Sequence, residues 1–175
     1  MPEDWSRREL VESLVAAERQ LDFRIPLGRL PRLESVLATP SGEAVGQVRF
    51  RRSLGTAVAD MSLAATPTLT CQRCMQPLEW PVASNSQVAL VPDVAAADRV
   101  VEGLETFVTE NDRVSVRDLV EEELLLALPL VPKCAAGNAC SRLVTDTRLQ
   151  QDVDDAPVSV QTPFAQLGEL LKRDQ

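Results

Sequence analysis

The chain of 175 residues has 45% hydrophobic and 25% charged residues, a composition typical of a globular domain and not of a disordered chain. It contains no histidine, which excludes Ser-His-Asp and Cys-His catalytic sites, HExxH zinc sites and histidine-ligated haem. The formal net charge of −8 and an aromatic content of only 3% argue against a general RNA-stacking surface.

The N-terminal region, residues 1–22, is predicted to be helical. Ser6 and Glu9 have the spacing of a capping box, in which a serine caps the first backbone N–H groups of a helix and a glutamate reaches back to the cap. The apolar residues that follow recur at spacings of three and four, as on one helix face: Leu10, Leu14, Ala17 and Leu21.

Residues 23–145 are predicted to form the core domain, which is of the α+β class. Apolar and polar residues alternate in several runs, which predicts β-strands at 21–27, 43–54, 57–63, 68–70 and 78–91. Residues 28–43 are predicted as a loop with a short helical turn, and a further short strand is expected at 104–109 after an acidic connector. We therefore expect an antiparallel β-sheet meander with two or three helices.

A second helix is predicted to begin after Ser115 and to end near Pro129, because serine is a good N-cap and proline cannot continue a helix. Glu121, Glu122 and Glu123 lie on this helix. Successive helical residues point about 100° apart, so the three cannot share one face as a nuclease Mg²⁺ site requires. We expect them to form a solvated helix face that favours a basic partner.

The last region, residues 146–175, is predicted to be an acidic tail with a short C-terminal helix that has Pro163 at its first position. No uncharged run approaches 18 apolar residues, so no membrane-spanning segment is expected. The first residues do not have the pattern of a signal peptide. We therefore expect a cytoplasmic protein with reduced cysteines.

The charge is unevenly divided along the chain. Residues 1–89 contain 10 Lys/Arg and 10 Asp/Glu, whereas residues 90–175 contain 8 Lys/Arg and 16 Asp/Glu. Within the neutral half, Arg49, Arg51 and Arg52 surround Phe50. This cluster is either the solvated face of a strand or a small patch that contacts phosphate.

The four cysteines form two pairs, Cys71 with Cys74 and Cys134 with Cys140. The C-x2-C spacing of the first pair is typical of zinc ligands, and a second pair on a distant loop would complete a tetrahedral site that pins the sheet to the second helix. Four reduced cysteines without metal, a redox C-x-x-C pair and static disulfides are the alternatives. The redox alternative is weakened because a thioredoxin-like motif opens a helix, while the two prolines after Cys74 predict an extended segment.

Three blocks of the sequence resemble the YceD family of bacterial and plastid proteins. They are the cysteine block at 71–78, the acidic and leucine-rich block at 118–132 that leads to Cys134 and Cys140, and the block at 162–167. The resemblance covers roughly residues 20–172. It implies a role in the accumulation of the large-subunit (23S) ribosomal RNA, through its synthesis, processing or stability, and implies no enzymatic activity. Many relatives have histidine near the position of Cys134, an exchange that keeps the character of a zinc ligand.

The first functional hypothesis is therefore a non-enzymatic ribosome-biogenesis factor. It would bind the large-subunit ribosomal RNA or the pre-ribosome, directly or through a basic ribosomal or processing protein, and no membrane or small-molecule substrate is expected. The candidate contact residues are Arg49, Arg51, Arg52, Glu121, Glu122 and Phe164. The alternatives are a metal-dependent ribonuclease or thiol oxidoreductase, and a structural zinc module for unrelated protein interactions.

Overall fold

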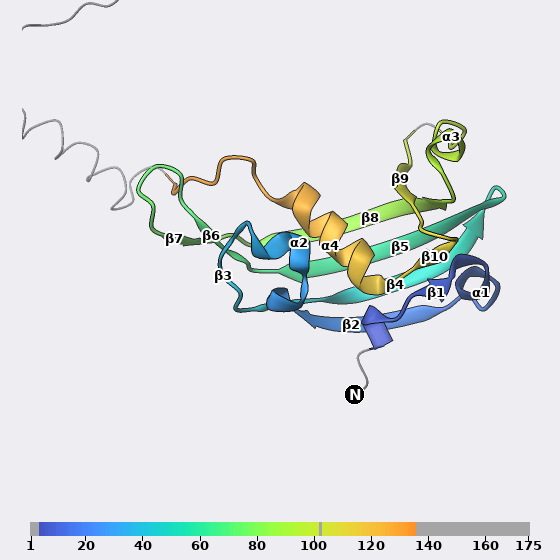
Figure 1. Ribbon diagram of the computed structural model, residues 1–175, viewed down its shortest axis with the longest axis horizontal. Helices are drawn as coiled ribbons and strands as arrows, with labels where there is room; N and C mark the ends of the chain where they lie inside the picture. Colours follow the sequence, from blue (N-terminus) through green and yellow to red (C-terminus); the bar gives the residue numbers. More distant parts are fainter. Residues whose placement is uncertain (1–3, 102, 136–175) are drawn as a thin grey trace, which may run out of the picture.

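The computed structural model describes residues 4–101 and 103–135 (Figure 1). Its helices are the 3₁₀ helices η1 (Asp4–Ser6) and η2 (Leu27–Arg29) and the α-helices α1 (Val11–Ala16), α2 (Pro31–Glu34), α3 (Val94–Ala97) and α4 (Val116–Ala127). Its strands are β1 (Glu9–Leu10), β2 (Gln20–Pro26), β3 (Leu37–Thr39), β4 (Glu43–Ser53), β5 (Thr56–Ala65), β6 (Thr68–Thr70), β7 (Pro77–Glu79), β8 (Val82–Val91), β9 (Glu105–Val108) and β10 (Arg113–Val114). The predicted α+β class is confirmed.

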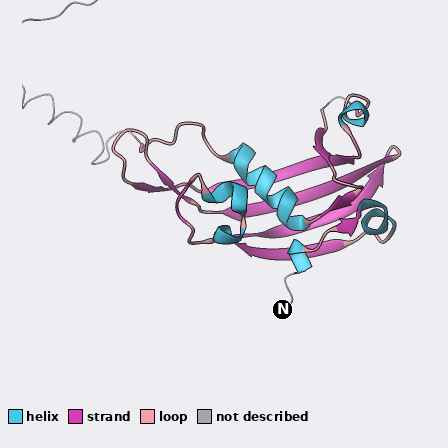
Figure 2. Ribbon diagram, viewed as in Figure 1, coloured by secondary structure: helices cyan, strands magenta, loops and turns pink. Residues whose placement is uncertain are grey.

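The main sheet has the strand order β2-β4-β5-β8-β9, and the first four strands form the predicted antiparallel meander. The last strand differs from the expectation because β9 pairs with β8 in parallel. Parallel neighbours need a crossover connection. Residues 92–104, which contain α3, provide it at one end of the sheet (Figure 2).

One face of this sheet is covered by helices, and the other carries polar side chains. Val48 and Phe50 of β4 are fully buried, whereas Gln47 and Arg49 beside them are exposed. The buried residues pack against α1, α2 and α4, which lie over the same face (Figure 1). The alternation of apolar and polar residues thus places the core on the helix side of the sheet.

The N-terminal helix is much shorter than predicted. Helix α1 begins at Val11 with Leu10 as its N-cap, and no side chain caps it. The predicted capping box at Ser6 is therefore wrong, because Glu9 and Leu10 instead pair as a strand with β10. Leu21 belongs to β2 and not to the helix. Long-range pairing here overrides a plausible local helix signal.

A second sheet with the order β3-β6-β7 was not predicted. Strand β6 matches the strand predicted at 68–70, and the run predicted as one strand at 78–91 is divided between β7 and β8. The strands of this sheet have three residues each, too few for a pattern to show which of them pair. Strand β3 lies within the segment predicted as a loop, and β6 and β7 enclose the first cysteine pair. This small sheet forms the end of the molecule opposite α3 and β9 (Figure 1).

Helix α4 is as predicted. The hydroxyl of Ser115 accepts a hydrogen bond from the backbone N–H of Asp118 at 3.1 Å, and the helix ends at Ala127, just before Pro129. No helix among the described residues is long and apolar enough to span a membrane. The predicted C-terminal helix, Phe164 and Cys140 lie outside the described residues.

Candidate metal centre and charged surfaces

Three of the four cysteines come together at the end of the small sheet. Cys71 and Cys74 lie in the turn between β6 and β7, and Cys134 lies in the segment after α4. Their sulfur atoms are all within 4.8 Å of one another, and those of Cys74 and Cys134 are 3.9 Å apart. Two thiolates bound tetrahedrally to one zinc ion lie about 3.8 Å apart, given a Zn–S distance of about 2.3 Å. The convergence predicted for these three residues is confirmed.

Backbone hydrogen bonds build this turn. The N–H of Cys71 donates to the carbonyl of Gln76, and the N–H of Met75 donates back to the carbonyl of Cys71, each at 2.9 Å. Met75 has a φ of 58°, which closes the turn in the left-handed region. The N–H of Gln72 donates to the carbonyl of Pro132 at 2.8 Å, so the turn is fastened to the segment that carries Cys134.

The surroundings of the Cys71 sulfur favour the thiolate. Backbone N–H groups of Arg73, Cys134 and Cys74 point at this buried sulfur and lower the pKa of Cys71 to about 5; that of Cys134 lies 3.4 Å away. Hydrogen bonds to a charged group stabilise its charged form. A set of three thiolates suits a soft or borderline metal such as zinc. The described residues therefore fit three ligands of a zinc ion, while Cys140 lies outside them.

The arginine cluster is split over the two faces of the main sheet. Arg49 and Arg51 lie on the polar face of β4, whereas Arg52 lies on the face that the helices cover. Each arginine also has a carboxylate partner: Arg49 pairs with Glu18 at 3.1 Å, Arg51 with both carboxylate oxygens of Asp60, and Arg52 with Glu12. The hydrogen bond to Asp60 raises the pKa of Arg51 above its ordinary value. The three arginines do not form one unpaired basic patch.

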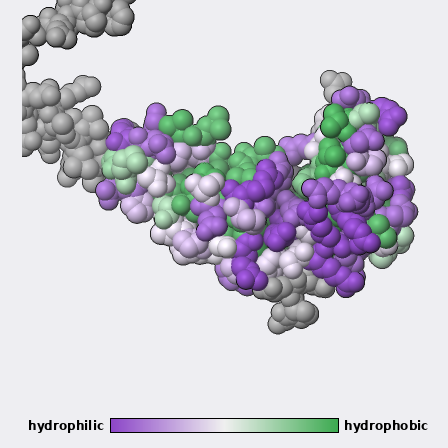
Figure 3. All heavy atoms as spheres, viewed as in Figure 1, coloured by the Kyte–Doolittle hydropathy of each residue, from purple (hydrophilic) through white to green (hydrophobic). Residues whose placement is uncertain are grey.

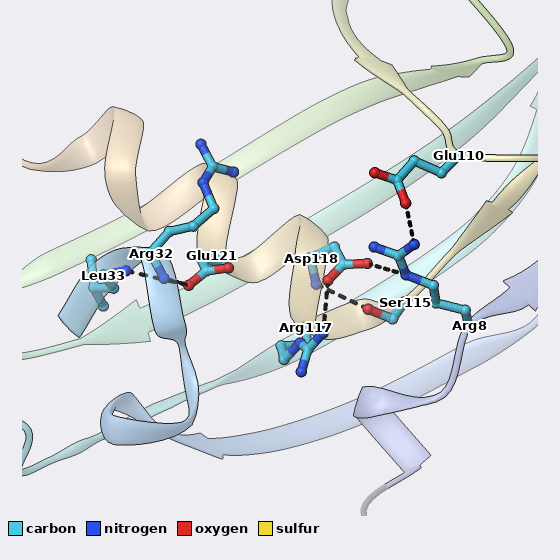
Figure 4. Close-up of polar contacts among 8 residues, drawn as sticks. All are labelled: Arg8, Arg32, Leu33, Glu110, Ser115, Arg117, Asp118 and Glu121. Carbon is cyan, nitrogen blue, oxygen red and sulfur yellow. Dashed lines mark hydrogen bonds and ion pairs between the residues drawn. The ribbon is translucent and has the colours of Figure 1, made fainter. Parts of the chain in front are cut away.

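The three glutamates of α4 have their partners on two neighbouring elements, α2 and β8. The carboxylate of Glu121 accepts the backbone N–H groups of Arg32 at 2.6 Å and Leu33 at 3.3 Å, so it caps the first turn of α2 (Figure 4). Glu122 pairs with the Arg32 side chain, and Glu123 accepts a hydrogen bond from the hydroxyl of Ser84 on β8.

The solvated acidic face predicted for α4 is wrong for two of these residues. Glu121 is 4% exposed and Glu123 is 9% exposed, because neighbouring elements cover both. Their burial could not be read from the helix alone, since the donors come from α2 and β8. The contact with a basic partner predicted for Glu121 and Glu122 stays a prediction.

A network of ion pairs near the start of α4 was not found from the sequence. Arg8 donates to Glu110 and to Asp118, and Arg117 also donates to Asp118, whose N–H is capped by Ser115 (Figure 4). The hydrogen bond to Glu110 and the charge of Asp118 raise the pKa of Arg8. Arg8 lies 102 residues before Glu110 and 110 residues before Asp118, so no local motif marks its place in the network. It balances positive with negative charge and offers no bare anion site.

Comparison with known proteins identifies the family. The family model described as "Large ribosomal RNA subunit accumulation protein YceD" matches residues 59–171. The chain belongs to the YceD family. The match includes all four cysteines, α4 and the block at 162–167, but begins within β5 and not near residue 20. No curated protein and no solved structure matches the chain.

Proposed function

We propose that this YceD-family protein supports the accumulation of the large-subunit (23S) ribosomal RNA as a non-enzymatic adaptor that binds a basic ribosomal or processing protein. The description of the family as an accumulation factor for this RNA supports the first part. The acidic second half of the chain supports the second part, because opposite charges steer the encounter of two proteins.

The observation that carries the adaptor hypothesis is the pairing of the arginine cluster. A bare guanidinium binds phosphate and releases counterions, which is the main source of affinity for RNA. Arg49, Arg51 and Arg52 already have carboxylate partners, which partly neutralise the positive charge that each offers to a phosphate. The three arginines would therefore contribute little free energy to the binding of RNA. Phe164 is kept as a candidate partner contact, although it lies outside the described residues.

The cysteine cluster has a structural role in this proposal. A zinc ion held by Cys71, Cys74 and Cys134, with Cys140 as the fourth ligand, would fasten the β6–β7 turn to the segment after α4. Four protein ligands leave no open position for a substrate, which is typical of a structural site. The ion would thus stabilise the small sheet and would have no catalytic role.

The enzymatic alternatives have less support. A nuclease needs carboxylates that converge on a metal ion, whereas Glu121 and Glu122 are both paired with α2 and Glu123 is paired with Ser84 of β8. A thiol oxidoreductase of the thioredoxin type needs a helix after its C-x-x-C pair, and β7 follows here.

Depletion in the organism that encodes the protein tests this function. We expect the ratio of 23S to 16S ribosomal RNA to fall and to recover when the wild-type gene is restored. Incubation of the purified protein with precursor RNA and Mg²⁺ should leave the RNA intact. An unchanged ratio would contradict the proposal, and cleavage lost in a Glu122→Gln variant would support the ribonuclease alternative.

A further inference from the structure

A groove with a volume of about 290 Å³ lies between α4 and the last strands of the main sheet. One wall is a stripe of α4 whose members are three and four residues apart and so share a face. The stripe contains Leu119, Glu122, Glu123 and Leu126. The opposite wall comes from the sheet and contains Val88 of β8 and Glu105 and Phe107 of β9. The groove lies on the side of α4 away from the α2 contact of Glu121.

The groove combines apolar walls with negative charge. Leu126 is 67% exposed, and Figure 3 shows apolar side chains gathered over the C-terminal part of α4 and the segment that follows. Glu105 is exposed and Glu123 is nine-tenths buried, and no Lys or Arg in the described part of the chain lies within 4 Å of either carboxylate. Among the described residues, Glu122 is the only glutamate of the groove that forms an ion pair, and its partner is the side chain of Arg32.

We infer that this groove binds an arginine or lysine side chain from a basic segment of the partner protein, an inference that rests on the proposed function. Both side chains have an apolar stem and a cationic head. The stem would lie along Phe107 and Leu126, and the head would reach Glu105 and Glu123, so the groove complements both parts.

The size and charge of the groove argue against other ligands. Small-molecule sites usually have volumes of about 300–1,000 Å³, so this groove is at the lower limit and suits an inserted side chain. Carboxylates repel phosphate groups, which disfavours RNA as the occupant. A basic protein segment is the class of ligand that the charge selects.

Fluorescence anisotropy with labelled peptides tests the inference on the full-length protein. The probe is a peptide of arginine and leucine, and its control has glutamate at each arginine position. The variants are Glu105→Lys and Leu126→Ala, with Glu79→Lys as a matched charge control on β7, at the other end of the molecule (Figure 1). Glu105, Leu126 and Glu79 are exposed, so all three variants should fold, which circular dichroism checks.

We expect wild-type protein to bind the basic peptide and not the acidic one. Glu105→Lys should weaken binding about two- to fivefold, the range expected for the loss of one exposed ion pair, and Leu126→Ala about three- to tenfold. Glu79→Lys should bind like wild type. Added salt should weaken the wild-type complex more than that of Glu105→Lys.

Equal weakening by Glu105→Lys and Glu79→Lys would overturn the inference, because it would show a general charge effect. So would unchanged binding by both groove variants, or stronger binding to an RNA oligonucleotide than to the peptide by wild type. The 23S to 16S ratio in cells separates this inference from the proposed function. If depletion lowers the ratio and the Glu105→Lys gene restores it fully, the function stands and the groove does not serve it.

Discussion

The cysteine cluster and the arginine cluster are both prominent in the sequence, but only the cysteines come together in the structure. Cys71, Cys74 and Cys134 come from two distant segments and meet within 4.8 Å. Arg49 and Arg52 are near neighbours in the sequence, yet they lie on opposite faces of β4. One cluster is assembled by the fold, and the other is divided by it.

The difference shows what sequence spacing can establish. A C-x2-C pair in a tight turn already brings two sulfur atoms together, so only the second segment must arrive. Successive arginines in a strand alternate between faces, and whether their positive charge is balanced depends on carboxylates from other elements. Here Glu18, Asp60 and Glu12 supply those carboxylates. A local excess of arginine therefore says little about the surface potential.

The largest effect is expected from breaking the cysteine cluster. Cys74→Ser should reduce bound zinc from about one equivalent per chain to less than about 0.1, with a lower melting temperature, because metal binding contributes to folding free energy. Elemental analysis and a thermal melt measure both. Gln72→Ser, an exposed neighbour in the same turn, is the matched control and should keep both values.

The same assay tests the fourth ligand. Cys140→Ser should also lose zinc if Cys140 completes the site. Wild-type protein that contains less than about 0.1 equivalent of any metal would contradict the zinc proposal. A Cys140→Ser variant with full zinc content would limit the protein ligands to the three described cysteines.

Two variants of α4 test whether its glutamates stabilise the folded protein. Glu121→Ala removes the acceptor for two backbone N–H groups at the start of α2, and should lower the free energy of unfolding by about 1–3 kcal/mol. Glu122→Ala removes a more exposed ion pair and should cost less than about 1 kcal/mol. Urea denaturation measures both, and equal losses would contradict the capping role of Glu121.

A smaller effect is expected within the arginine cluster. Arg51 and Asp60 are joined by two hydrogen bonds, with about 30% of each side chain exposed. A double-mutant cycle of Arg51→Ala and Asp60→Ala should give a coupling free energy of about 0.2–1 kcal/mol. No measurable coupling would mean that Arg51 is available to other ligands.

The smallest effect is expected on RNA. The combined variant Arg49→Gln, Arg51→Gln and Arg52→Gln should change the affinity for a large-subunit ribosomal RNA fragment by less than about twofold. Gel shifts at several salt concentrations measure it, with Arg24→Gln, on the same sheet face as Arg49 and Arg51, as a control. A clear loss of affinity, with a salt slope lower by about one for each arginine, would show direct phosphate contact.

Much of the fold follows from local patterns. Strands β2, β4 and β5 follow the alternation of apolar and polar residues, and α4 follows its Ser115 cap and the proline after its end. The short α1, strand β3 and the pairing within the second sheet do not follow from such patterns, because pairing with distant segments decides them. The parallel pairing of β9 depends likewise on the path of the α3 crossover.

The candidate site was likewise predictable only where local spacing determines it. Cysteine spacing indicated three residues that meet, since a metal site needs few residue types and tight turns. The capping role of Glu121 and the acidic groove were not predictable, because their partners on α2, β8 and β9 are distant in sequence. A helical residue can be assigned to a face from its spacing, but whether that face is covered depends on the tertiary structure.

We propose that this YceD-family protein acts through a protein contact and not through its arginines. Purification of the tagged protein from growing cells after ultraviolet crosslinking, with and without ribonuclease treatment, tests it most directly. We predict that a basic protein of the large subunit or of its processing machinery stays bound after ribonuclease treatment, and that Glu105→Lys reduces its recovery while Glu79→Lys does not. Large-subunit ribosomal RNA crosslinked to Arg49, Arg51 or Arg52, with every protein lost after ribonuclease treatment, would contradict it.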